Sequence, residues 1–197
     1  AGDMRVACQP LNLVELVRST LDSVAAVAAA QQVTLAPPPC VRELWVQADP
    51  VRLRQVLFNL LSNDIKYNHR GGGVAVRVAR RNGEALLVVQ DTGQGLTPDQ
   101  QAQLFQPFNR LGAERSGVQG TGIGLSIAHG LVAAMRGRLD VRSQSGVGSE
   151  FTVVLPLAQA QVEAAPTAAD SAYGALDENT RTQGALLYVE DNEVNVL

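Results

Sequence analysis

The sequence predicts an α+β two-layer sandwich, with a mixed and mostly antiparallel sheet that has helices on one face. Apolar residues recur at helical spacing over residues 12–31, 50–70 and 123–135, and several shorter segments have the apolar character of strands. Asn82-Gly83 joins two of these segments, and this dipeptide is a strong signal for a hairpin. A mixture of helices and hairpins favours the two-layer class over a doubly wound sheet, which requires regular strand–helix alternation.

Predicted helices begin where a capping residue precedes an apolar repeat. Asn12 is followed by Glu15, which fits a capping box at the start of the first helix. Asp49-Pro50 supplies an N-cap and a proline at the first helical position of the second helix. Thr97-Pro98 repeats this pattern before a short helix. These signals predict where three helices begin.

The predicted strands cover residues 33–35, 44–48, 74–81, 85–91, 139–143 and 150–157. Val74, Val76 and Val78 alternate with other residues, so we expect one face of that strand to be buried. The segment Leu86–Val89 is apolar at every position, which predicts a central strand covered on both faces.

The chain has 197 residues, enough for one large domain or for one domain with an appendage. We predict a domain over residues 1–157, an alanine-rich linker over 158–184 and the truncated start of a second domain over 185–197. Residues 1–157 carry a net charge of +3, and the rest of the chain carries −6. A charge of +3 is too weak for a bulk nucleic-acid binder, and no apolar run reaches the roughly 18 residues of a membrane span.

A polar stripe interrupts the apolar pattern of the second predicted helix. Asn59, Asn63 and Lys66 are spaced i, i+4 and i+7, so they lie on one helix face. Carboxamide oxygens suit a hard divalent cation, and an adjacent ammonium group suits a phosphate. Taken alone, the stripe is equally compatible with a solvated helix face.

Glycine-bearing motifs follow the stripe along the chain. Asp91–Gly95 ends an apolar strand, where a carboxylate can accept a hydrogen bond from an exocyclic amine or belong to a simple turn. Gly117–Leu125 leads into a helix, whose N-terminus favours an anion. This segment lacks the features of a dinucleotide fingerprint or a Walker loop, which leaves another kind of phosphate cradle or a flexible linker. We expect Phe105 and Phe108 to anchor the intervening loop in the core.

Taken in this order, the segments resemble the nucleotide-binding domain of bacterial sensor histidine kinases. These kinases share an ATPase superfamily with heat-shock chaperones, type II topoisomerases and mismatch-repair ATPases. The resemblance covers about residues 10–157 and implies a Bergerat-type ATP-binding fold. The matching motifs are the N box (59–68), the first glycine box (91–95), the F box (105–108), the second glycine box (120–124) and the closing strand Gly146-x-Gly148-Ser149-x-Phe151.

The resemblance implies ATP and Mg²⁺ as cofactors. It implies that Asn63 holds the Mg²⁺ that bridges the phosphates, and that Asp91 binds the adenine amino group. Asn59 and Lys66 are the catalytic residues that it implies, and both also line the nucleotide site. The other implied binding residues contact the phosphates (Tyr67 and Arg110), pack beneath the adenine (Gly93 and Gly95) or form the lid (Gly120, Thr121, Gly122, Gly124 and Leu125).

Asn59 separates the branches of this superfamily. Hydrolytic members carry glutamate there as a general base, and an amide cannot take a proton. The resemblance therefore implies a protein-histidine kinase, in which positioning and charge neutralisation promote phosphoryl transfer. A hydrolysing ATPase of the same superfamily is the alternative. Neither His69 nor His129 stands in the family's acceptor context, so we expect the acceptor histidine on a separate helical domain.

Asp64 departs from the family pattern, which usually has alanine at this position. A carboxylate next to Asn63 would either repel the triphosphate or turn away, because successive helix residues point about 100° apart. We expect this chain to bind nucleotide more weakly than its Asp64→Ala variant. Asp64 also favours a third interpretation, a non-catalytic interaction module that has lost nucleotide binding.

The segment Leu186–Asn192 resembles the first strand and acidic pair of a response-regulator receiver domain, with a solvated acidic end as the alternative. We therefore expect a cytoplasmic piece of a hybrid sensor histidine kinase, whose parent is either free or anchored in the inner membrane. The implied partners are the parent's helical dimerisation and phosphoacceptor domain and a receiver domain or response regulator. We expect no nucleic-acid partner and no membrane contact by this piece.

Overall fold

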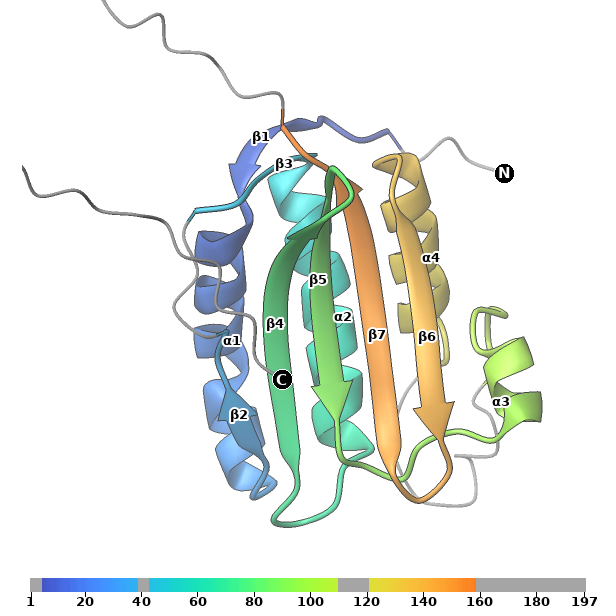
Figure 1. Ribbon diagram of the computed structural model, residues 1–197. Coiled ribbons are helices and arrows are strands. Elements are labelled where there is room, and N and C mark those ends of the chain that lie inside the picture. The colour runs from blue at the N-terminus through green and yellow to red at the C-terminus, as the bar shows by residue number, and fades with distance from the viewer. Residues whose placement is uncertain (1–4, 39–42, 110–120, 159–197) are drawn as a thin grey trace, which may run out of the picture. The chain divides into compact units, whose positions relative to one another are not determined.

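A five-stranded sheet with the order β2-β4-β5-β7-β6 forms the centre of the computed structural model (Figure 1). The structure describes residues 5–38, 43–109 and 121–158. Neighbouring strands pair antiparallel except β2 and β4, which are parallel, so the predicted mixed and mostly antiparallel sheet is confirmed. The strands are β2 (Thr34–Ala36), β4 (Gly73–Arg81), β5 (Glu84–Asp91), β6 (Arg138–Gln144) and β7 (Gly148–Pro156).

Helices α1 (Leu13–Ala30), α2 (Pro50–Lys66) and α4 (Gly124–Ala134) cover one face of this sheet, and the short α3 (Pro98–Gln103) lies beside the end of β6 (Figure 1). The predicted caps are confirmed. The side chains of Asn12, Asp49 and Thr97 each accept hydrogen bonds from backbone N–H groups of the first turn that follows. These caps determine where α1, α2 and α3 begin.

A second, two-stranded sheet pairs β1 (Gln9–Asn12) with β3 (Trp45–Ala48). Sequence analysis did not predict β1, because a four-residue strand that contains Pro10 shows no usable alternation. A bridge between Val46 and Leu157 joins this small sheet to the segment after β7. The small sheet thus ties the start of the domain to its last strand.

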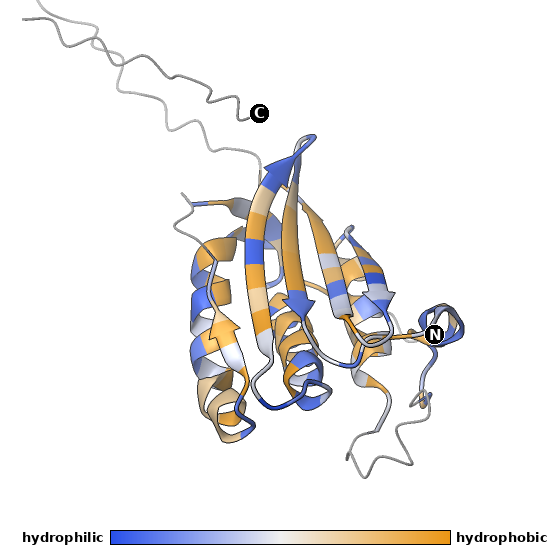
Figure 2. Cartoon of the chain, turned by 60° about the horizontal axis from the view of Figure 1, so that its bottom comes forward, coloured by the Kyte–Doolittle hydropathy of each residue, from blue (hydrophilic) through white to orange (hydrophobic). Residues whose placement is uncertain are grey.

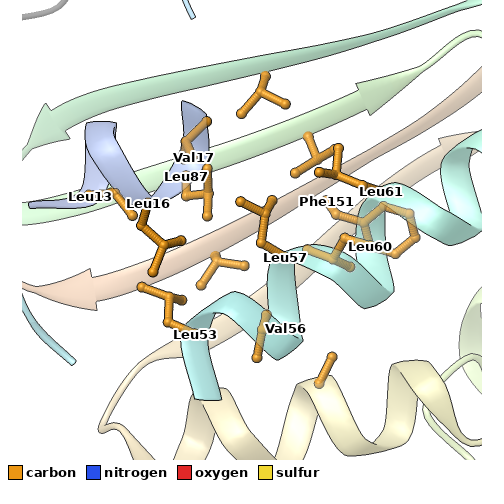
Figure 3. Close-up of a cluster of buried hydrophobic side chains, with 14 of the residues drawn as sticks. Leu13, Leu16, Val17, Leu53, Val56, Leu57, Leu60, Leu61, Leu87 and Phe151 are labelled. Carbon is orange, nitrogen blue, oxygen red and sulfur yellow. The ribbon is translucent and has the colours of Figure 1, made fainter. Parts of the chain in front are cut away.

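The core lies between the sheet and the helices, and α2 contributes more fully buried side chains to it than any other helix. The fully buried side chains of α2 point toward α1 and the sheet, except Val56, which points toward α4 (Figure 3). Figure 2 shows hydrophobic residues concentrated along the strands of the large sheet. Burial of a leucine side chain contributes about 1.5–3 kcal/mol. The buried apolar residues of α2 therefore determine the rotation of this helix about its axis. They are Leu53, Val56, Leu57, Leu60, Leu61 and Ile65.

The prediction that β5 is covered on both faces was wrong. Ala85, Leu87 and Val89 are buried beneath the helices, whereas Leu86 and Val88 on the opposite face are only half-buried. The continuous apolar run reflects the central position of β5 between β4 and β7, and no second helical layer covers this face in the described residues. An apolar run in a central strand therefore does not distinguish one covering layer from two.

The described part of the chain reaches residue 158, so the predicted linker and the predicted receiver-like segment lie outside it. The boundaries of the three predicted segments stay predictions. Among the described residues, no helix combines the length and the apolarity needed to cross a membrane.

Candidate functional site

A pocket of about 510 Å³ lies among the C-terminal half of α2, the loop after β5, α3, the start of α4 and the turn between β6 and β7. Several sequence-predicted residues meet here although they are far apart along the chain. Those that line the pocket are Asn63, Lys66, Tyr67, Asp91, Gly95, Thr121, Gly122, Gly124 and Leu125.

Of the other predicted site residues, Asn59 and Gly93 lie next to the pocket without lining it. The Asn59 side chain donates a hydrogen bond from Nδ2 to the carbonyl oxygen of Gly124 at 3.1 Å. This bond connects α2 to the first residue of α4. Arg110 and Gly120 lie outside the described residues.

The α2 side of the pocket presents an amide and an ammonium group. Asn63 and Lys66 are half-buried and face away from the leucines that pack against the sheet. The Lys66 Nζ lies 5.0 Å from the centroid of the Tyr67 ring, and Tyr67 is the residue at which α2 ends. The predicted polar stripe therefore reaches the pocket through Asn63 and Lys66, and Asn59 instead supports the wall.

Asp91 forms the carboxyl group at the end of β5. Its Oδ1 accepts a hydrogen bond from the Gly93 N–H, and its Oδ2 accepts one from the Ser149 N–H at 3.1 Å. The side chain is buried, and this burial raises the pKa of Asp91 above its ordinary value, although the two amide bonds oppose the increase. The pocket thus contains a carboxyl group that the backbone holds in one orientation.

Asp64 lies in the same pocket and is 3% exposed. Its Oδ2 is buried and has no hydrogen-bond partner among the described residues. Burial raises the pKa of Asp64 well above its ordinary value, and the charge of Asp91 raises it further. The Asp64 side chain thus lines the same pocket as Asp91, and its expected effect on a bound triphosphate stays a prediction.

Glycines allow the loop after β5 to pack closely against the turn between β6 and β7. Gly95 has φ +62°, and a Cβ atom there would collide with the carbonyl oxygen of Gln144. Gly148 has φ +134°, and a Cβ atom there would collide with the carbonyl oxygen of Asp91. Both positions require glycine for conformation and space, and this close packing brings the Ser149 N–H to the Asp91 carboxyl.

The start of α4 forms another wall. No side chain among the described residues caps this helix, so the N–H groups of its first turn are available to an anion. Gly122, at φ +70°, lines the pocket just before the helix, and its carbonyl oxygen accepts a hydrogen bond from Phe108 N–H at 3.1 Å. The described part of the predicted glycine-rich segment therefore places at the pocket a helix N-terminus that no described side chain caps.

The prediction that both phenylalanines anchor the loop in the core was wrong for Phe108. Its side chain is 79% exposed and its φ is +63°. Phe105 instead stacks on the exposed His129 of α4, with ring centroids 4.6 Å apart, and the adjacent Leu104 is buried. One aromatic ring thus holds this segment against α4, and the other faces solvent.

Sequence reasoning missed the wall that α3 contributes. The capping pair Thr97 and Gln100 also lines the pocket, as do Leu96 and Leu104 on either side of the helix. The sequence signal that could have indicated this wall is the pair of leucines on either side of an otherwise polar helix. Ser149 and Phe151 of the predicted closing strand also line the pocket, and further lining residues that the sequence assigned no role are Gln94, Asn109 and Ser145.

Comparison with known proteins agrees with this geometry. Residues 48–159 match the family described as histidine kinase-, DNA gyrase B-, and HSP90-like ATPase. The chain belongs to this family. The matched range contains all the walls of the pocket, from the start of α2 to the end of β7.

Similar proteins of this ATPase family include sensor kinases. The chain is 40% identical over 157 residues to the virulence sensor protein BvgS of Bordetella bronchiseptica. This match covers 77% of the chain and 13% of BvgS. The chain is also 38% identical over 164 residues to the circadian input-output histidine kinase CikA of Synechococcus elongatus. This match covers 79% of the chain and 21% of CikA. The chain therefore corresponds to a minor part of each relative.

A solved structure has a similar fold over most of the chain. The crystal structure of full-length ShkA in complex with AMPPNP matches 81% of the chain and 33% of ShkA, with a TM-score of 0.68 and 31% identity. The predicted ATP-binding α+β sandwich is confirmed by this match and by the family assignment.

Proposed function

We propose that the chain is the Mg²⁺-ATP-binding catalytic domain of a hybrid sensor histidine kinase. In this proposal it donates the γ-phosphoryl group of ATP to a histidine on a helical domain outside this sequence. The observation that carries the proposal is the combination of groups in the pocket. It contains one backbone-anchored carboxyl, an amide, an ammonium group and an uncapped helix N-terminus, which together suit a base with an amino group and a chain of phosphates.

The proposed role of Asp91 is to bind the base. Its two oxygens accept bonds from Gly93 and Ser149, so its orientation is set before any ligand enters. A carboxylate has about four lone-pair sites, which leaves capacity for the exocyclic amino group of adenine. Prior orientation lowers the entropy lost when the base binds.

The proposed phosphate end consists of Asn63, Lys66 and the start of α4. The residues fit a Mg²⁺–triphosphate group, because the Asn63 amide oxygen is a hard donor and the half-buried Lys66 ammonium can approach phosphate oxygens. When bound, Mg²⁺ supplies neutralisation of the phosphate charge. Tyr67, Gly95, Thr121, Gly122, Gly124 and Leu125 complete the proposed nucleotide contacts that line the pocket.

Transfer, rather than hydrolysis, is favoured by Asn59. An amide cannot remove a proton from water, and its Nδ2 is already engaged with the carbonyl oxygen of Gly124. Lys66 and the α4 amides can instead orient the terminal phosphate and stabilise its charge during transfer.

Kinase function further implies partners outside this sequence. They are the parent's helical dimerisation and phosphoacceptor domain and a receiver domain or response regulator. The BvgS and CikA relatives, which are named as a sensor protein and a histidine kinase, support this part of the proposal. We further propose that the domain works in the cytoplasm, where ATP is available, and that the parent is either free or anchored in the inner membrane.

Calorimetric titration of the full 197-residue chain with AMPPNP and Mg²⁺ tests the proposal. We expect one site, and we expect Lys66→Ala to weaken binding about tenfold, because it removes a charge-assisted hydrogen bond. The matched control is Arg80→Ala, which removes an exposed cation from β4, outside the pocket. Unchanged binding in Lys66→Ala contradicts the assigned phosphate end.

Incubation with ATP separates the alternatives. The proposal expects nucleotide binding without steady phosphate release and without self-phosphorylation. Steady release that Lys66→Ala abolishes indicates a hydrolysing ATPase instead. Absence of nucleotide binding in a folded chain indicates the degenerate interaction module, which the buried and unpartnered Asp64 carboxyl favours.

A further inference from the structure

Asp64 is a buried polar group that neither the fold nor the proposed phosphate chemistry uses. The side chain is 3% exposed, and its Oδ2 has no hydrogen-bond partner in residues 5–38, 43–109 and 121–158. No ion pair within those ranges involves it. A buried carboxyl oxygen without a partner costs about 1–3 kcal/mol or more, so its presence calls for an explanation.

The position of Asp64 in the pocket indicates which part of a ligand it meets. Asp64 follows Asn63 on α2, and successive residues of a helix point about 100° apart. Asn63 and Lys66 are half-buried, whereas Asp64 is buried like Asp91 at the end of β5, and both carboxyls line the pocket. Asp64 therefore accompanies the carboxyl assigned to the base, not the groups assigned to the phosphates.

The two carboxyls differ in the hydrogen bonds that the protein already donates to them. Asp91 is held by two backbone N–H groups, and Asp64 Oδ2 is held by none in the described structure. Both side chains line the pocket, so a ligand can reach both. The ligand can therefore supply the hydrogen bond that Asp64 lacks.

We propose that Asp64 is a second base-recognition residue, and that Asp64 and Asp91 together select a purine with an exocyclic amino group, such as adenine, over a 6-oxo purine. This inference rests on the proposed function. An amino group carries two N–H donors, one for each carboxyl. When both carboxyls are ionised, a 6-oxo group presents only an acceptor and leaves carboxylate oxygens facing another oxygen, which costs the penalty of unpaired buried groups.

Affinities for ADP and IDP in the presence of Mg²⁺, measured by calorimetry on the full chain, test this proposal. The relevant quantity is the ratio of the two affinities, because any contact with the diphosphate cancels in it. The sequence alone led us to expect tighter nucleotide binding by Asp64→Ala, and this proposal reverses that expectation. We now expect the variant to lower the ratio about tenfold, chiefly by weakening ADP, through the loss of one buried hydrogen bond to the amino group.

Asp64→Asn distinguishes recognition from a structural effect. An amide can rotate to present either an oxygen or an NH₂ group. We therefore expect this variant to retain ADP affinity within about threefold and to gain IDP affinity, which a merely loosened pocket would not produce. The matched control, Asp22→Ala, removes an exposed carboxylate from α1, and its ratio is expected to equal that of the original chain.

The remaining outcomes separate the two proposals. If the original chain, Asp64→Ala and Asp64→Asn bind both nucleotides with the same affinity ratio, the role of Asp64 is overturned and the proposed function stands. An equal gain for ADP and IDP in Asp64→Ala also overturns it, because that result indicates repulsion of the phosphates. If none of the folded variants binds either nucleotide, the proposed function itself fails, and the role of Asp64 fails with it.

Discussion

A buried aspartate stands near each end of α2, and the two carboxyls differ in the hydrogen bonds that they accept. Asp49 caps the helix and is 8% exposed, and Asp64 lies near the other end and is 3% exposed. Asp49 accepts hydrogen bonds from the N–H groups of Ala7, Val51 and Arg52. Asp64 Oδ2 accepts none from the described residues.

The pKa values of these carboxyls shift in opposite directions. The Ala7 N–H bond lowers the pKa of Asp49 below its ordinary value, with the Arg52 and Val51 N–H groups adding to this effect and burial opposing it. Burial raises the pKa of Asp64, and nearby Asp91 raises it further. Burial alone therefore does not determine whether a carboxylate is favourable. The number of donors that the backbone offers decides it, and a carboxyl without donors is a candidate for ligand contact.

The largest effect is expected from Asp49→Ala. This change removes an N-cap and the bond that ties Ala7 to α2, so we expect a loss of about 2 kcal/mol in the free energy of unfolding at pH 7. Because the folded-state pKa of Asp49 is lowered, its contribution is present above the unfolded value of about 3.9 and disappears as the pH falls through the folded value. Urea unfolding between pH 3 and pH 7 measures both.

Asp49→Asn is the control for the Asp49 prediction. Asparagine is also a good N-cap, so it should retain most of the stability at pH 7 and lose the dependence on pH. A stability difference between Asp49→Ala and the original chain that stays constant down to pH 3 would contradict the assigned carboxylate role.

A smaller effect of opposite sign is expected from Asp64→Ala. Without nucleotide, and with a chelator present, we expect this variant to be more stable by about 1 kcal/mol at pH 8, because it removes an unpartnered buried carboxyl. Between the unfolded pKa of about 3.9 and the raised folded pKa, the native state retains a proton that the unfolded state releases, so the original chain loses stability as the pH rises. The advantage of the variant should therefore increase from pH 4 to pH 8.

Urea unfolding of the two proteins at several pH values measures this difference. If Asp64→Ala is less stable than the original chain at pH 8, Asp64 has a stabilising partner, and the proposed difference between the two aspartates is contradicted. Asp64→Asn keeps the shape and removes the charge, so it should share the flat pH dependence of Asp64→Ala.

The capping residues explain why much of the fold was predictable. Asn12, Asp49 and Thr97 act on the residues that follow them, so the chemistry of each helix start is contained in a few consecutive positions. The Asn82-Gly83 hairpin is local in the same sense, and its two residues have φ of +52° and +78° as such turns require. Signals of this kind need no knowledge of distant segments.

The parts that were missed depend on segments far apart in the sequence. β1 pairs with β3 across more than thirty residues, and Pro10 gives no local signal for that pairing. The lack of a partner for Asp64 Oδ2 depends on where β5 ends and on the start of β7, because the Ser149 N–H donates to Asp91. The order of the motifs indicated a nucleotide site. It could not indicate which carboxyl accepts backbone hydrogen bonds, because these bonds form only when the strands of the sheet pack together.

The smallest effect is expected at Asn12, which caps α1 without a charge. Its Oδ1 accepts from the N–H groups of Val14 and Glu15 at 3.1 and 3.4 Å. Replacement by alanine should lower the free energy of unfolding by about 0.5–1 kcal/mol, because the bonds are long and partly solvated and have no third partner like the Ala7 bond of Asp49. The loss should be the same at pH 4 and pH 7, since asparagine does not titrate. Urea unfolding at those two pH values then separates a capping contribution, which both N-caps share, from the charge contribution that only Asp49 makes. A loss at Asn12 as large and as pH-dependent as that at Asp49 would show that the charge is not what distinguishes the two caps.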